Sequence, residues 1–241
     1  PTLQALQAAG TWYEQARGVM ASETLPNHVA MATGTYPGRN GIPGNAGRAT
    51  PGDSEAADPD LGDPAYLQAD SFVEAIESVC PDLRTVTVLS KAYVHRVFLD
   101  DPVDSRFPQE AFNIPESDHA PDASTVGFIE QELLAGDGVD HLFANLGDVD
   151  RAGHIDETGF TRTVPVLRRA AITQTDTLLG GMVETLKGQG LWDSTVLVVS
   201  SDHSMDYSNA LDPATYVDLR GALAADARTA DRFLVSENGG A

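Results

Sequence analysis

The stretch from Thr85 to Ser90 reads TVTVLS, and it decides the fold class of this chain of 241 residues. A short run of β-branched residues without a charge is typical of a strand that is buried on both faces. Two further apolar stretches, DHLFANL at 140–146 and TVLVVSS at 195–201, are also expected to be buried strands. Trp12 to Met20 predicts a shorter strand, and Arg232 to Ser236 predicts a last one.

Stretches with helical spacing of apolar residues separate these strands. The expected helices cover residues 1–10, 27–33, 71–79, 124–135, 161–187 and 216–225. Residues 34–63 and 100–122, rich in Gly, Pro and acidic side chains, are expected to be loops, the second a long surface loop or lid. Strands that alternate with helices predict a mostly parallel central sheet with helices on both faces, in a single α/β domain over residues 1–241.

The charge balance excludes several classes of partner. Lys and Arg total 15 while Asp and Glu total 36, which gives a formal net charge of −21. A protein that binds a nucleic-acid duplex or an anionic membrane surface needs a basic face, so neither partner is expected. No apolar run approaches the length that spans a bilayer. The single cysteine, Cys80, excludes a disulfide within the chain.

Polar side chains follow three of the expected strands, at the edge where ligands bind to open α/β sheets. Asp150 and His154 follow the strand at 140–146, and Asp202 and His203 follow the strand at 195–201. Asp and His suit zinc, and a spacing of four residues would direct both Asp150 and His154 to one point on a helix. Thr24 follows the first expected strand. It is a candidate nucleophile, and the alternative is that it caps the next helix.

Three stretches together resemble a known family. They are ETLPNHVAMATGTYPGRNGIPGN at 23–45, NLGDVDRAGHIDETG at 145–159 and VVSSDHSM at 198–205. In this order they resemble the alkaline phosphatase superfamily, and within it the type I phosphodiesterase/nucleotide pyrophosphatase branch, with the phosphonoacetate hydrolases nearby. The resemblance implies an alkaline-phosphatase-like fold and a zinc-dependent hydrolase that acts on a small-molecule phosphate ester or phosphonate.

The same resemblance assigns roles to individual residues. Thr24 would be the nucleophile that forms a phospho-threonine intermediate, and Asn45 would hold a phosphoryl oxygen. Asp150 and His154 would bind one zinc ion. Asp202 and His203 would bind the other zinc ion, which also contacts Thr24. The family has a first-strand aspartate and a late histidine as further ligands, and neither has a counterpart here. The chain is therefore expected to be a fragment, incomplete at both ends, of a secreted or periplasmic protein.

Several other residues carry weaker expectations. Lys91 follows the strand at 85–90, and it is either a surface lysine or, as in phosphonoacetate hydrolases, a contact to the substrate. His28 is expected to order the turn at Thr24, and Asp148 to support the nearby ligands. The remaining histidines receive no functional role; they are His95, His119 and His141. Phosphonoacetate hydrolase, alkaline phosphomonoesterase and a non-catalytic domain that binds a phosphorylated ligand remain as alternative functions.

Overall fold

The computed structural model describes residues 1–20, 22–45, 66–98, 101–107, 119–136, 138–158, 166–205, 219–226 and 228. At its centre lies a parallel sheet of three strands in the order β2-β1-β3. The strands are β1 (Thr85–Leu89), β2 (Ser105–Phe107) and β3 (His141–Asn145). The expected α/β class with a parallel sheet is therefore confirmed.

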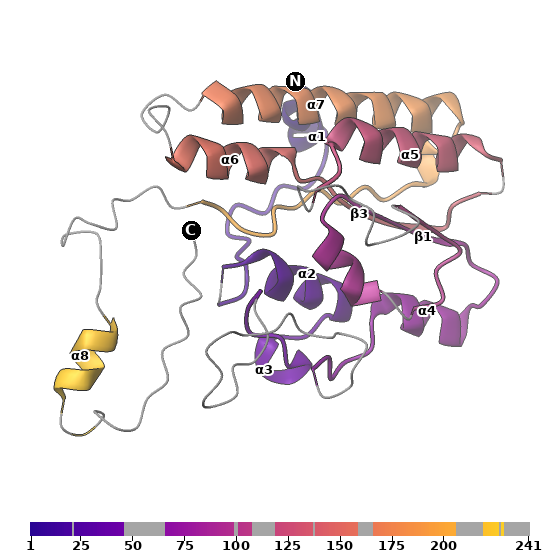
Figure 1. The fold of residues 1–241 in the computed structure, drawn as a ribbon. Helices are drawn as coiled ribbons and strands as arrows, with labels where there is room; N and C mark the ends of the chain where they lie inside the picture. The colour runs from indigo at the N-terminus through magenta and orange to yellow at the C-terminus, as the bar shows by residue number, and fades with distance from the viewer. Residues whose placement is uncertain are drawn as a thin grey trace.

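Helices cover both faces of this sheet (Figure 1). On one face lie α1 (Thr2–Ala9), α5 (Asp122–Leu134), α6 (Asp148–Thr158) and α7 (Val166–Gly188). On the other face lie α2 (Thr24–Thr33), α3 (Pro37–Asn40), α4 (Phe72–Val79) and the 3₁₀ helix η1 (Ala92–Phe98). A second 3₁₀ helix, η3 (Trp192–Ser194), follows α7, and α8 (Leu219–Ala225) lies near the C-terminal end.

The strand β1 divides the core into two layers, because successive side chains of a strand point to opposite faces. Val86 and Val88 are fully buried and pack against Ile129 of α5. Leu89 points the other way and packs in a cluster that includes Leu25 of α2. Burial of one such aliphatic side chain is worth about 1.5–3 kcal/mol. The TVTVL strand is therefore the element on which both helical layers are assembled.

A capping box fixes the start of α4. The Ser71 hydroxyl accepts hydrogen bonds from the backbone N–H groups of Val73 and Glu74, and the Glu74 carboxylate accepts one from the Ser71 N–H. This reciprocal pair satisfies backbone donors that a helix start otherwise leaves unpaired. Ser71 also donates to Asp101 at 2.5 Å, so the same residue joins α4 to the segment before β2.

Two predicted strands are not strands in the structure. Residues 12–20 contain a turn at Glu14–Gln15 and are almost entirely exposed. Residues 195–200 are irregular, with Val196 89% and Val198 80% exposed. A strand needs a neighbour to pair its backbone groups, and within the described part of the chain neither segment has a ladder with β1, β2 or β3.

Other element boundaries differ in smaller ways. The predicted loop at 100–122 contains β2, which forms at the sheet edge between Pro102 and Pro108, and it also contains the start of α5. The predicted loop at 34–63 contains α3, whose first residue is a proline. The expected strand at 232–236 lies outside the described residues, as do residues 46–65, 108–118, 159–165 and 206–218. No helix among the described residues has the length and hydropathy needed to cross a membrane.

Candidate active site

Thr24 is the first residue of α2 and is 3% exposed. The helix begins three residues earlier than the sequence predicts, so Glu23 occupies the cap position and the alternative capping role for Thr24 is wrong. The next backbone group, the Leu25 N–H, donates to Asn45 Oδ1 at 2.7 Å. The start of α2 therefore brings Thr24 and Asn45 together, at a helix end whose N–H groups favour an anion.

The Thr24 hydroxyl lies between a histidine and a lysine. His203 Nε2 is 3.1 Å from Thr24 Oγ1, and Lys91 Nζ donates to the same oxygen at 3.1 Å. His203 Nδ1 lies 2.9 Å from the backbone oxygen of Ser204, which only a protonated nitrogen can satisfy. In neutral His203, Nε2 therefore carries a lone pair, and Thr24 donates its proton toward it.

Lys91 also binds a predicted metal ligand. Its ammonium donates to Asp150 Oδ2 at 2.7 Å, and the lysine is only 7% exposed. Burial opposes the charge, but nearby Tyr93 and the hydrogen bond to Asp150 outweigh it, so the pKa of Lys91 is raised. Burial also raises the pKa of Tyr93, whose side chain hydrogen-bonds to those of Thr24 and Lys91. The expectation of a surface lysine is wrong, because Lys91 lies inside the site.

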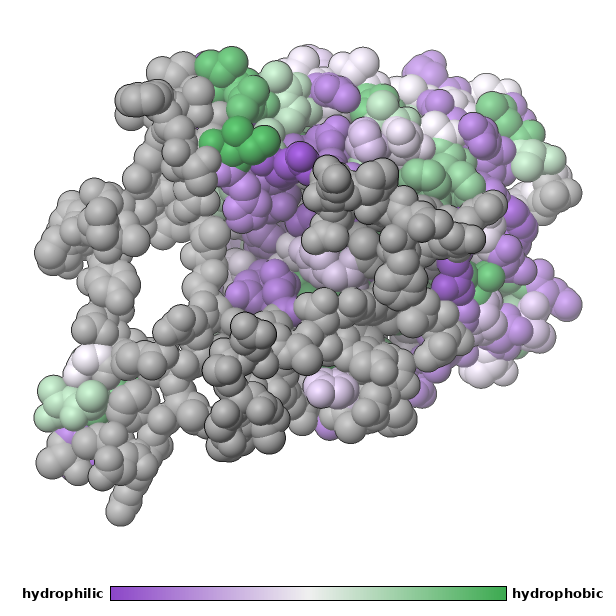
Figure 2. Space-filling view, in the orientation of Figure 1, coloured by the Kyte–Doolittle hydropathy of each residue, from purple (hydrophilic) through white to green (hydrophobic). Residues whose placement is uncertain are grey.

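The remaining predicted ligands converge on the same place. His203 Nε2 lies 3.5 Å from Asp202 Oδ2 and 3.9 Å from Asp150 Oδ1. His154 Nε2 lies 3.6 Å from Asp150 Oδ1, one turn along α6. Figure 2 shows hydrophilic residues gathered between α6 and α2. Carboxylates and imidazoles are donors that suit zinc. Among the described residues, however, the three such donors that lie within 4.8 Å of one another belong to another group.

A buried series of hydrogen-bonded side chains leads to the backbone of Thr24. Ser90 Oγ donates to Asn145 Oδ1 at 2.9 Å, and Asn145 Nδ2 lies 3.0 Å from His28 Nε2. His28 Nδ1 lies 2.8 Å from the Thr24 backbone oxygen and 3.5 Å from Asp202. Burial lowers the pKa of His28 despite Asp202, which favours the neutral ring. The ordering role expected of His28 matches this contact, whereas Ser90, Asn145 and Tyr93 were not singled out from the sequence.

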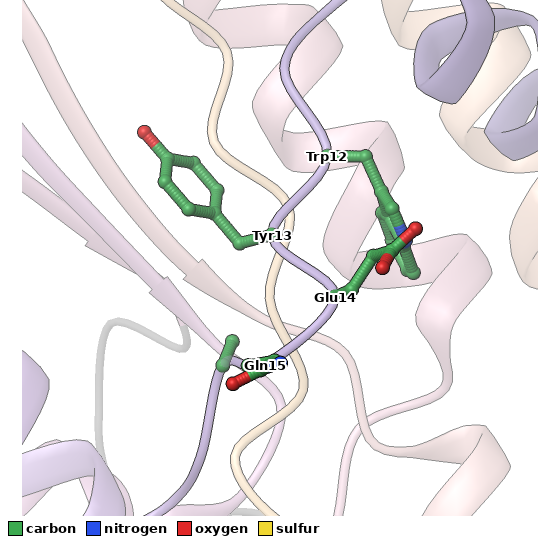
Figure 3. A pocket seen from close by; sticks show the side chains of 5 residues that line it. Trp12, Tyr13, Glu14 and Gln15 are labelled. Carbon is green, nitrogen blue, oxygen red and sulfur yellow. The ribbon is translucent and has the colours of Figure 1, made fainter.

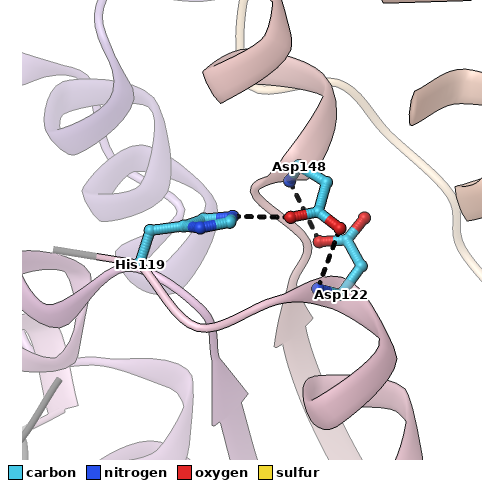
Figure 4. Close-up of side chains that lie close together, drawn as sticks. All are labelled: His119, Asp122 and Asp148. Atoms are coloured by element: carbon cyan, nitrogen blue, oxygen red, sulfur yellow. Dashed lines mark hydrogen bonds and ion pairs between the residues drawn. The ribbon is translucent and has the colours of Figure 1, made fainter. Parts of the chain in front are cut away.

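A second group lies beside the site, where α5 and α6 begin (Figure 4). Ligand atoms of His119, Asp122 and Asp148 lie within 4.8 Å of one another, so these residues could hold a metal ion. His119 Nε2 lies 3.1 Å from Asp148 Oδ1, and the two aspartates cap each other's helices. Asp122 Oδ1 accepts from the N–H groups of Gly147 and Asp148, and Asp148 Oδ2 accepts from the Asp122 N–H. Burial and the charge of Asp122 raise the pKa of Asp148, and burial lowers that of His119.

An open pocket of about 530 Å³ is lined by residues 12–16. Figure 3 shows that Trp12 and Tyr13 point to opposite sides of the backbone there. None of the predicted site residues lines this pocket. Gly18, two residues after this stretch, does lie beside the site. A Cβ atom at Gly18 would be 3.2 Å from the Asp202 backbone oxygen.

Comparisons with known proteins agree with this fold. The most similar solved structures include murine ectonucleotide pyrophosphatase / phosphodiesterase 5, at 18% identity and a TM-score of 0.59. The same values are found for its inactive threonine-to-alanine variant in complex with AMP. Each alignment covers 80% of this chain and 48% of the other, so the chain spans about half the length of these relatives. No curated protein matches the chain.

The family comparison covers almost the whole sequence. The family model described as type I phosphodiesterase / nucleotide pyrophosphatase matches residues 1–236. This span includes the start of α2, the start of α6 and the segment that carries His203. The chain therefore belongs to the type I phosphodiesterase / nucleotide pyrophosphatase family.

Proposed function

We propose that this chain carries the catalytic residues of a metal-dependent phosphodiesterase or nucleotide pyrophosphatase, with Thr24 as the nucleophile. The observation that carries the proposal is the environment of Thr24 Oγ1, with His203 Nε2 and Lys91 Nζ each 3.1 Å away. A threonine hydroxyl is a weak nucleophile until a base, a positive charge or a metal ion activates it. An imidazole nitrogen and an ammonium both face this hydroxyl.

The residues that would hold metal ions are Thr24, Asp150, His154, Asp202 and His203, with two zinc ions expected from the family resemblance. Metal ions bound there would lower the pKa of the nucleophile and neutralise charge on the phosphoryl oxygens. The His203 Nε2 lone pair can either accept the Thr24 proton or bind a metal ion, and it cannot do both. Local positive charge matters because a chain of net charge −21 repels an anionic ester.

The proposed reaction has two displacements at phosphorus. Thr24 Oγ1 gives its proton to His203 Nε2, or to water where a metal ion holds that nitrogen, and forms a bond to phosphorus. The bond from phosphorus to the leaving oxygen breaks, and that oxygen keeps the electron pair. Water then attacks phosphorus, the bond to Thr24 Oγ1 breaks, and the hydroxyl recovers a proton. Asn45 would hold a phosphoryl oxygen through its amide NH₂ group, because its Oδ1 already accepts from the Leu25 N–H.

We infer that the substrate is a small nucleotide-like ester and that the protein acts outside the cytoplasm. The support is the murine relative, which is an ectonucleotide pyrophosphatase / phosphodiesterase and whose variant binds AMP. Replacement of a threonine inactivates that relative, which agrees with a threonine nucleophile here.

The test is a rate assay on Thr24→Ala with the chain loaded with Zn²⁺. We expect kcat/KM for a nucleotide phosphodiester to fall by roughly 10³-fold or more, as when other enzymes lose their nucleophile. Thr33→Ala is the matched control, because Thr33 lies in the same helix and its hydroxyl bonds only Val29 and Thr35. Undiminished hydrolysis by the Thr24 variant would exclude the mechanism.

The position of Lys91 favours a second candidate, a phosphomonoesterase or a phosphonoacetate hydrolase. An ammonium 3.1 Å from the nucleophile is within reach of a phosphoryl oxygen, and a monoester carries more negative charge there than a diester. Comparison of kcat/KM for a phosphodiester, its matching monoester and phosphonoacetate separates these activities. No hydrolysis of any of them, together with binding of inorganic phosphate, would favour a non-catalytic binding domain.

A further inference from the structure

The chain has only two lysines, and both pair with a carboxylate and lie near an aromatic ring. Lys187 Nζ lies 2.8 Å from Glu184 Oε1 and 5.6 Å from the Trp192 ring, on the exposed side of α7. Lys91 Nζ lies 2.7 Å from Asp150 Oδ2 and 5.9 Å from the ring of a tyrosine. The two differ in surroundings, because the Lys91 side chain is 9% exposed and that of Lys187 is 47% exposed.

The position of the Lys91 ammonium is the unusual feature. It lies between Thr24 Oγ1 and Asp150 Oδ2 and donates to both. These two oxygens belong to residues that we propose as metal ligands. One proposed metal ion would bind Asp150 and the other would contact Thr24, so the ammonium now donates to one oxygen of each proposed metal site.

We propose that Lys91 is an internal competitor for the metal at Asp150, and that it thereby sets the metal affinity of the site. The inference rests on the proposed metal-dependent function and deepens it. When a metal ion takes the Asp150 carboxylate, the ammonium gives up that partner and keeps Thr24 Oγ1 as an acceptor. It then remains beside the nucleophile, where it can donate to a phosphoryl oxygen.

The energetics of buried ion pairs give the direction of the effect. Removal of one partner leaves the other as an uncompensated charge in a poorly solvated place, which is strongly unfavourable. Without Lys91, the Asp150 carboxylate would be such a charge, and a divalent cation would relieve it. Loss of the lysine is therefore expected to tighten metal binding. The same change removes a positive charge that would face an anionic substrate.

The test measures metal affinity without substrate. Zn²⁺ is titrated calorimetrically, and Co²⁺ by its absorption spectrum, into the full chain and into Lys91→Met. We expect Lys91→Met to bind the metal at least about tenfold more tightly, a difference of one decade in Kd. Lys187→Met removes the other lysine, also from an ion pair, and should leave Kd unchanged. Equal or weaker binding by Lys91→Met would overturn the inference.

A second measurement uses the unaltered chain, in case Lys91→Met does not fold. Isotope labelling of lysine gives only two side-chain NMR signals. Addition of Zn²⁺ should shift the signal of Lys91, as it leaves Asp150, and should not move that of Lys187. Metal binding with no change at Lys91 would overturn the inference, while the result with Thr24→Ala would stand. A chain that binds no metal would overturn both the inference and the metal dependence.

Discussion

Two pairs of segments that the sequence predicts as strands have different structures. Residues 85–89 and 141–145 form adjacent parallel strands between two layers of helices. Residues 12–20 and 195–200 have a comparable share of aromatic and β-branched side chains, but they are irregular and largely exposed. β-propensity describes how well a residue fits a pleated, half-buried surface. The difference shows that neighbours, more than composition, decide which segment becomes a strand.

The largest expected effect uses the same substitution in both regions. Val88→Asp places a carboxylate where the side chain is fully buried, and it should cost more than about 4 kcal/mol and unfold the domain. Val198→Asp changes a side chain that is 80% exposed and should cost at most about 0.5 kcal/mol. Urea denaturation followed by circular dichroism measures both. Similar losses for the two variants would mean that residues 195–200 are packed like a strand.

Acid should lower the stability of the fold around strand β1 through protonation of His95. Its Nε2 donates to the Leu89 backbone oxygen at the end of β1, and burial lowers its pKa to about 4. In the unfolded chain the His95 imidazole binds a proton below about pH 6.5, whereas in the folded chain it does so only near pH 4. The contribution of His95 to the free energy of unfolding is therefore complete above pH 6.5. It falls by about 3 kcal/mol as the pH decreases toward 4.

Denaturation curves between pH 4 and pH 7 check this sign. His95→Gln, which keeps an N–H donor for Leu89 but does not titrate, should show a weaker pH dependence. An equally steep dependence in that variant would assign the effect to other buried histidines.

The smallest expected effect compares two serines. Ser71→Ala removes the capping box of α4, which packs over the covered strands, and should cost about 1 kcal/mol. Ser194→Ala, next to the exposed segment, removes a hydroxyl that donates to the Leu191 backbone oxygen, and should cost at most about 0.5 kcal/mol. Thermal unfolding ranks the two, and the reverse order would contradict the comparison.

Much of the fold is predictable from local patterns. TVTVLS and DHLFANL lie in strands within a residue of the predicted ends, and the helices at 71–79 and 161–187 agree with α4 and α7 where these are described. The pattern failed where a strand needed a partner, as at TVLVVSS. It also missed β2, because three residues at a sheet edge give too short a signal to detect among prolines.

The candidate site follows from sequence in part. Thr24, Asp150, His154, Asp202 and His203 were predicted from motifs, and they lie close together in the structure. Tertiary contacts are not predictable from the sequence. Thr24 and Lys91 are 67 positions apart, and nothing local to either residue indicates that their side chains meet. The hydrogen bond between Ser90 and Asn145 is not predictable from the sequence for the same reason.

The two sides of the site differ in local stability, and the reciprocal caps of Asp122 and Asp148 stabilise one of them. They join the start of α6, and with it Asp150, to α5 and so to the packed strand β1. His203 instead follows the exposed segment at 195–200. Segments with little packing open at much lower free energies than the core does. Local opening would therefore take His203 away from Thr24 while Asp150 stays in place, so the site can be dismantled and rebuilt without unfolding the domain.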